Sequence, residues 1–321
     1  MTDLEYKNLL QNILKLYNKK APNIPERILD TSLTALLKVY ARGYKSVYNT
    51  LVNALLSMDE NTSLLTQASI LAQLDTQLSK LNQEVSEEIK KTFTGAYLEG
   101  YTLHILGTEK ISKLEELVDL APFSLINTHK IKQAAADTFE DLLFVTQHTK
   151  KETKKVIREV ISRNIQLGVA TNQSNRAMIN IIKKELSPKA IKDTVSKKAF
   201  VGIVDSAGRR WNLKNYVEMA VKTKAHQVHV AALQDRALET GYDLAKIPYK
   251  GAADNCRNFE GMVISLNGES KDFLSYETLK ASGLIFHPNC QHHPIPIGDF
   301  NLLPEDDKLL HQKRLNSLKT L

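Results

Sequence analysis

The segment Phe286-His287-Pro288-Asn289-Cys290-Gln291-His292-His293 decides how the C-terminal part of the chain folds. It holds three histidines and one of the two cysteines in the 321 residues. The other cysteine, Cys256, lies upstream in Asp254-Asn255-Cys256-Arg257-Asn258-Phe259-Glu260-Gly261. We expect these two segments to meet in space and to close a C-terminal domain.

The thiols and imidazoles of these segments predict a structural zinc site. Zinc binds cysteine sulfur and histidine nitrogen, and the spacing His287-x-x-Cys290 is short enough for a zinc knuckle. Two other interpretations stay open: the thiols are buried as apolar groups, or they form a disulfide once the protein leaves a reducing compartment. The predicted ligands are Cys256, His287, Cys290 and His292, with His293 or Asp254 as alternatives to His292.

The bulk composition is that of a soluble globular protein. Hydrophobic residues make up 42% of the chain and charged residues 25%, which is enough apolar material for a core. The 43 basic and 36 acidic residues leave a net charge of +7, which permits contact with nucleic acid without requiring it. The sequence shows neither a signal peptide nor an apolar run long enough for a membrane helix, so we expect no membrane partner.

The N-terminal half is predicted to be mainly helical, with long helices that pack as a bundle. Apolar residues recur every three or four positions, and no proline occurs between Pro25 and Pro122 to interrupt the helices. From Leu71 to Val85 the spacing resembles a short coiled-coil seam, which Ile89 to Tyr101 continues. The predicted helices cover residues 3–19, 28–56, 71–101, 109–119, 128–148, 151–167 and 173–186.

The composition changes near residue 197, because eight of the 13 glycines and both cysteines lie after residue 200. We expect a helical domain over 1–196, a small α+β domain with short strands over 197–300, and a charged tail over 301–321. The fold class is therefore α+β. The expected elements of the second domain are strands at 200–204 and 209–211, a helix at 212–240 that ends before Gly241, and strands at 244–249 and 262–266.

Several stretches of the C-terminal half resemble the phage minor capsid protein 2 family, relatives of the Mu F-like head-morphogenesis proteins. The resemblance covers about 100 residues in order, and it is carried by residues 202–211, 216–223, 241–243, 256–266 and 287–292. The chain departs from the family pattern at two notable positions. Ala253 stands where a further cysteine is usual, and Phe259 replaces the usual tryptophan.

The resemblance implies a structural minor capsid protein of a tailed phage or prophage. It implies a role in head morphogenesis and DNA packaging at or near the portal, with the portal protein and other head proteins as partners. It also implies assembly in the bacterial host cytoplasm and residence in the virion. On this interpretation the protein is not an enzyme.

The rival interpretation is a packaged effector enzyme, either ADP-ribosyltransferase-like or zinc-dependent. An ADP-ribosyltransferase typically needs a Glu-x-Glu or Gln-x-Glu triplet, and the sequence contains neither. His226 and His229 share one face of the predicted helix, and with His287 and His292 they could build a hydrolytic site. No His-Glu-x-x-His motif accompanies them, so a polar helix face explains them better.

A third interpretation is a protein that binds double-stranded DNA without sequence specificity. The densest basic region includes one predicted helical segment, and lysine contacts to phosphates would be sensitive to salt. Interspersed lysines more commonly form a solvated helix face. The predicted DNA-binding residues are Lys150, Lys151, Lys154, Lys155 and Arg158.

Overall fold

The structure is a computed structural model that describes residues 3–18, 34–39, 64–111, 113–122, 127–140, 213–288 and 290–318, together with isolated positions elsewhere. The chain divides into two compact units. The first unit comprises Met1–Thr34, Lys90–Ala136 and Met219–Leu321, and the second comprises Ala35–Ile89 and Asp137–Glu218. Each unit combines segments that are far apart in the sequence. The predicted domains 1–196, 197–300 and 301–321 are contiguous segments, and their boundaries stay a prediction.

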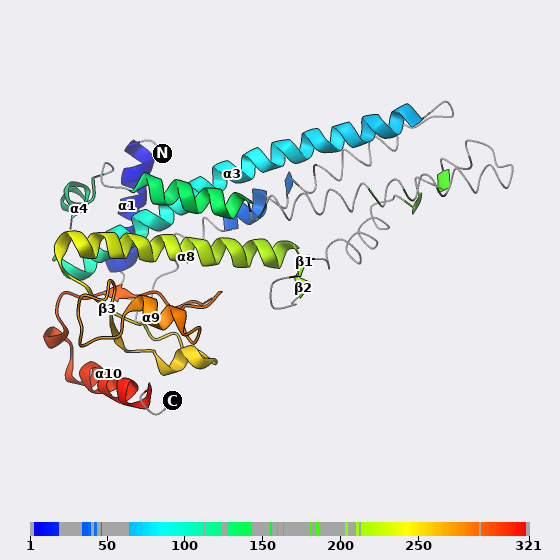
Figure 1. The fold of residues 1–321 in the computed structure, drawn as a ribbon. Helices are drawn as coiled ribbons and strands as arrows, with labels where there is room; N and C mark the ends of the chain where they lie inside the picture. Colours follow the sequence, from blue (N-terminus) through cyan, green and yellow to red (C-terminus); the bar gives the residue numbers. More distant parts are fainter. Residues whose placement is uncertain are drawn as a thin grey trace. The chain divides into compact units, whose positions relative to one another are not determined.

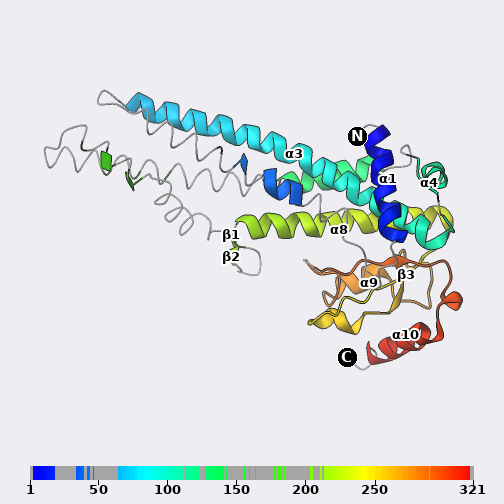
Figure 2. The ribbon, with the colours of Figure 1, turned by 180° about the vertical axis from the view of Figure 1, so that it is seen from behind.

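Among the described elements, the longest is helix α3, Leu64–Thr108, which continues beyond the predicted end of the seam. The predicted seam residues Leu78, Leu81 and Val85 are buried, as are Ile89 and the later residues of the same face. In the first unit, the end of α3 runs beside α8, and α1 (Asp3–Asn18) packs against α4 (Leu114–Leu120) (Figure 1; Figure 2). The predicted helix at 128–148 is seen over 128–140.

Helix α8, Leu213–Thr240, confirms the helix predicted at 212–240. It ends at Gly241, whose φ of 76° is the left-handed conformation that glycine adopts most easily, and whose N–H donates to Ala237 O at 2.8 Å. Polar contacts join α8 to α3 within the first unit. The Tyr97 hydroxyl donates to Asp235 Oδ2 at 2.7 Å, and the Tyr101 hydroxyl donates to Glu239 Oε2 at 2.6 Å.

Within the described residues, two short antiparallel sheets complete the α+β fold that the sequence predicted. Strands β1 (Ile203–Val204) and β2 (Arg210–Trp211) lie within the two strands predicted at 200–204 and 209–211, and they pair antiparallel. In the first unit, β3 (Leu244–Lys246) is the central strand between β4 (Val263–Ser265) and β5 (Ile295–Pro296). β5 was not predicted, because a two-residue strand that contains proline carries no alternating pattern; proline is accepted there because the strand lies at the sheet edge.

One hydrophobic core of the first unit lies between this sheet, α8 and α9 (Tyr276–Ala281). Helix α9 is another element that the sequence did not reveal, and Ser275 caps it by accepting a hydrogen bond from Thr278 N. The residues of this core include Cys256 and Phe259 of the first cysteine-bearing segment and Phe286 of the second, all buried. The two cysteine-bearing segments are therefore anchored in the same core.

The predicted tail forms helix α10, Glu305–Leu318, which is attached to the sheet through a buried histidine. His311 Nδ1 accepts a hydrogen bond from Val263 N at 3.1 Å, and its ring packs against Phe273 and Phe300, which also contact each other. An ion pair of 2.6 Å between Lys246 and Asp307 adds to this attachment. Burial lowers the pKa of His311 below its ordinary value.

Acidification is therefore expected to weaken the folded state through His311. Below about pH 6.5, the ordinary pKa of histidine, His311 takes up a proton in the unfolded chain. In the folded chain its pKa is lower, so it stays neutral until the pH falls further. Stability is thus lost as the pH falls, by about 1.4 kcal/mol for each unit of pKa depression once the pH is below both values. A protonated ring also cannot accept from Val263 N. Urea unfolding at about pH 8 and about pH 5.5 measures the loss.

The matched control is His311→Asn, whose amide oxygen takes the place of Nδ1, can accept the same hydrogen bond and does not titrate. We expect the stability of this variant to depend less on pH than that of the wild type. Equal losses of unfolding free energy in the two proteins would contradict the assignment to His311.

Candidate metal centre

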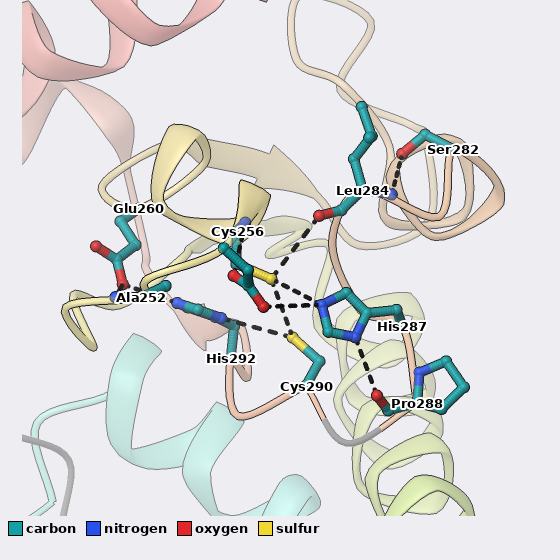
Figure 3. A network of polar contacts seen from close by, with 10 residues as sticks. Ala252, Cys256, Glu260, Ser282, Leu284, His287, Pro288, Cys290 and His292 are labelled. Carbon is teal, nitrogen blue, oxygen red and sulfur yellow. Dashed lines mark hydrogen bonds and ion pairs between the residues drawn. The ribbon is translucent and has the colours of Figure 1, made fainter. Parts of the chain in front are cut away.

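The first arm of the site is a short 3₁₀ turn that Asp254 initiates. Asp254 Oδ1 accepts a hydrogen bond from Cys256 N at 3.0 Å, which caps the turn Asn255–Asn258. Cys256 is 2% exposed, and its Sγ donates weakly to Leu284 O at 3.8 Å. The cap therefore holds the first thiol toward the second segment (Figure 3).

The second arm is a turn that follows α9. Phe286 has a φ of 58°, a left-handed conformation that is costly for a bulky residue, and its side chain is buried against Tyr276 with ring centroids 4.6 Å apart. Cys290 N then donates to His287 O at 2.9 Å, which closes the His287-x-x-Cys290 spacing into a tight turn. Packing of the Phe286 ring thus stabilises the bend that directs His287 toward Cys256.

The ring of His287 is oriented by the backbone carbonyl of the next residue, Pro288. His287 Nδ1 lies 3.0 Å from Pro288 O, so this nitrogen carries the proton and donates it. His287 Nε2 therefore faces Cys256 Sγ, 3.2 Å away, with its lone pair available (Figure 3). A backbone acceptor on the far ring nitrogen is the usual way in which a protein fixes the tautomer of a metal-binding histidine.

Cys256, His287 and Cys290 form a group that could hold a metal ion. Their ligand atoms all lie within 4.8 Å of one another, and the two sulfurs are 3.8 Å apart. Two ligand atoms on one tetrahedral zinc lie about 3.3–3.8 Å apart, given Zn–S bonds of about 2.3 Å and Zn–N bonds of about 2.0–2.1 Å. The spacing of this group therefore fits a metal that takes nitrogen and sulfur ligands.

His292 extends the group on the side of Cys290. Its Nδ1 lies 3.5 Å from Cys290 Sγ, and its Nε2 lies 2.9 Å from Glu260 Oε1 (Figure 3). Asp254, the alternative ligand, lies on the other side, with Oδ2 3.4 Å from His287 Nε2 and a side chain that is 59% exposed. His292 and Asp254 thus flank the three-residue group from opposite ends.

The ionisation of the two thiols is unequal. Burial and the neighbouring Cys290 raise the pKa of Cys256 far above its ordinary value. Burial acts in the same direction on Cys290, but hydrogen bonds from His292 outweigh it, and the pKa of Cys290 is lowered. The pKa of His292 is raised, because Cys290 and Glu260 outweigh the effect of its burial. Cys290 is therefore the thiol that ionises first, and a bound cation would favour ionisation of both.

The remaining candidate histidines form a separate cluster. His293 Nδ1 lies 2.6 Å from His226 Nδ1, and the rings of His293 and His229 meet edge to face with centroids 5.4 Å apart. His226 and His229 share one helix face as predicted. His226 contacts Tyr276, Phe286 and His293, and His229 contacts His293. The structure therefore brings them to His293, and not to His287 and His292.

Sequence reasoning missed Glu260. This carboxylate is 2% exposed, and its Oε1 accepts hydrogen bonds from Lys250 N at 2.8 Å and Ala252 N at 3.0 Å as well as facing His292. These partners outweigh burial and lower the pKa of Glu260. In the sequence, only its place in the Cys256–Gly261 segment connects Glu260 with the candidate site. That place does not indicate that the carboxylate is buried.

The predicted DNA-binding residues lie almost entirely outside the described residues. Lys155 is described, and its Nζ lies 4.0 Å from Glu159 Oε1, with both side chains more than half exposed. Lys150, Lys151, Lys154 and Arg158 are outside the described part. Within that part, none of the helices combines the length and the apolarity needed to cross a membrane.

Comparison with known proteins identifies one related family. The family model described as phage minor capsid protein 2 matches residues 24–319, which is most of the chain and includes both arms of the candidate metal centre. No curated protein and no solved structure matches the chain significantly.

Proposed function

The chain belongs to the phage minor capsid protein 2 family, and from that membership we propose that it acts at or near the portal of a tailed-phage or prophage head. Its role is that of a structural protein of the phage head, and its partners are other head proteins. The observation that carries the proposal is the extent of the family match, which spans residues 24–319. The proposal adds the portal protein as a direct partner, assembly in the host cytoplasm, and a part in DNA packaging.

Deleting the reading frame from the phage or prophage tests the role in the head. Particles made without the protein are expected to be fewer, incomplete or unable to infect, and a tagged copy supplied in trans should restore them and purify with the virion. Crosslinking within purified particles should join the tagged chain to the portal protein. Normal infectious particles that lack the chain would overturn the proposal.

A non-enzymatic role is part of the same proposal. The alternative is a packaged effector, ADP-ribosyltransferase-like or zinc-dependent, for which the residues proposed from the sequence provide no catalytic triplet. The neighbouring reading frames distinguish the two. Portal and capsid genes on either side favour a head protein, whereas an isolated position beside an immunity gene favours an effector.

The candidate metal centre is proposed to bind one structural zinc through Cys256, His287 and Cys290. The support is the chemistry of the donor set and its spacing, because two thiols and an imidazole nitrogen lie within 4.8 Å of one another. Bound zinc would supply coordination bonds between the turn at Asn255–Asn258 and the loop after α9. In a unit whose sheet has three short strands, such a clamp contributes directly to folding.

Contact with packaged DNA is proposed for the basic segment at 150–158. If all five basic side chains of this segment contact phosphates, the logarithm of the binding constant should fall against log salt with a slope of about −4.5. Replacing Lys154 and Lys155 with glutamine should bring the slope closer to zero by about 1.8. A flat salt dependence in the wild type would exclude a role in phosphate contact.

A further inference from the structure

We propose that His292 supplies the fourth ligand of the metal centre through Nδ1, and that Glu260 is the positioning residue that presents this nitrogen. This inference rests on the zinc proposal above, which names three ligands and leaves the fourth open. It also assigns a role to Glu260. Among the predicted ligands drawn in Figure 3, Glu260 contacts His292 alone.

The geometry at His292 is that of a histidine held by a carboxylate. The side chains of His292 and Glu260 are 3% and 2% exposed, and Nε2 lies 2.9 Å from Oε1. When Nε2 donates its proton to a carboxylate, the lone pair of Nδ1 remains for a metal. This nitrogen lies 3.5 Å from Cys290 Sγ, within the separation of about 3.3–3.8 Å expected for neighbouring ligands on one zinc. It lies outside the group of three whose ligand atoms are all within 4.8 Å of one another, so metal binding must draw it closer to Cys256 or His287.

Glu260 is itself fixed by the backbone. Its Oε1 accepts from Lys250 N and Ala252 N, and the next residue, Gly261, donates its N–H to Ile247 O at 2.9 Å. Gly261 has a φ of 85°, and a Cβ atom there would lie 2.4 Å from Leu310 Cδ2. The position of the carboxylate is therefore set by the loop after β3, and the orientation of the His292 ring follows from it.

The two alternative fourth ligands fit less well. His293 faces away from the thiols, because its Nδ1 is in contact with His226 Nδ1 at 2.6 Å. Asp254 is more than half exposed, and its Oδ1 already accepts from Cys256 N. A second imidazole also balances the charge of zinc against two thiolates, whereas a carboxylate would leave the buried centre with a net negative charge.

Cobalt(II) binding to the full chain tests the assignment, because cobalt reports ligand number and type through its visible spectrum. The wild type is expected to bind one cobalt with a tetrahedral spectrum and sulfur charge-transfer bands. His292→Ala should change the spectrum and weaken zinc binding by more than about 100-fold, and Glu260→Gln should weaken it by about 10–100-fold while keeping the tetrahedral spectrum. Asp254→Asn, which preserves the cap, and His293→Gln should behave as the wild type.

The double variant separates positioning from general support of the fold. If Glu260 acts through His292, adding Glu260→Gln to His292→Ala should cause no further loss of zinc affinity. Additive losses, or full wild-type affinity in Glu260→Gln, would refute the positioning role. An unchanged His292→Ala protein beside an impaired Asp254→Asn protein would make Asp254 the fourth ligand. A wild type that binds no metal would refute this inference and the zinc proposal together.

Discussion

Replacing Cys290 with serine is expected to abolish stoichiometric zinc binding and to lower the melting temperature of the full chain. Zinc takes the thiolate of Cys290 as a ligand in this proposal, and a serine hydroxyl is a poor substitute because it stays protonated. If free zinc exceeds its dissociation constant a thousandfold, the metal stabilises the folded state by about 4 kcal/mol. In a unit of this size, the loss corresponds to about 8–16 °C in Tm.

Elemental analysis of protein purified without chelator measures the metal, and thermal unfolding measures the stability. Wild-type protein treated with a chelator is the matched control, because it should melt close to the untreated Cys290→Ser variant. The variant itself should not respond to the chelator. A wild type that carries no zinc would contradict the proposal, and a mass lower by the two thiol hydrogens would show a disulfide between Cys256 and Cys290 instead.

Replacing Gly100 with alanine is expected to destabilise the first unit, although alanine is the better helix former. Gly100 lies in α3 where α8 crosses it, and an added Cβ would lie 2.2 Å from His229 O and 3.1 Å from Ala232 Cβ. Helix propensity favours alanine by about 1 kcal/mol. The contact with backbone oxygen cannot be relieved by a side-chain rotation, so the helices must separate, at a net cost of about 3 kcal/mol.

Thermal unfolding followed by circular dichroism checks the sign of this change. Separation of the helices would also lengthen the hydrogen bonds from Tyr97 to Asp235 and from Tyr101 to Glu239. The matched control is Gly298→Ala, where the nearest atom to the new Cβ is Thr108 O at 3.9 Å. A Gly100→Ala protein as stable as the wild type would mean that α3 and α8 do not approach this closely.

Much of the helical architecture follows from local signals in the sequence. The periodic apolar residues from Leu78 to Tyr101 are buried on α3 as their spacing predicted, and Gly241 predicted the end of α8. Strand β5 could not be predicted, because it has two residues and one of them is proline. Helix α9 could not be predicted, because its six residues are too few to show a helical periodicity. The expected helices at 28–56, 151–167 and 173–186 fall wholly or largely outside the described residues.

By itself, the sequence determined the chemistry available at the candidate metal centre: two cysteines, the knuckle spacing of His287 and Cys290, and further histidines and a carboxylate nearby. Only the tertiary structure decided how His292 and His293 differ. Adjacent residues in a non-helical segment point in different directions, and what lies on each side is set by packing of distant elements. Glu260 and Cys290 lie on one side and helix α8 on the other, so His292 faces the thiols and His293 faces His226.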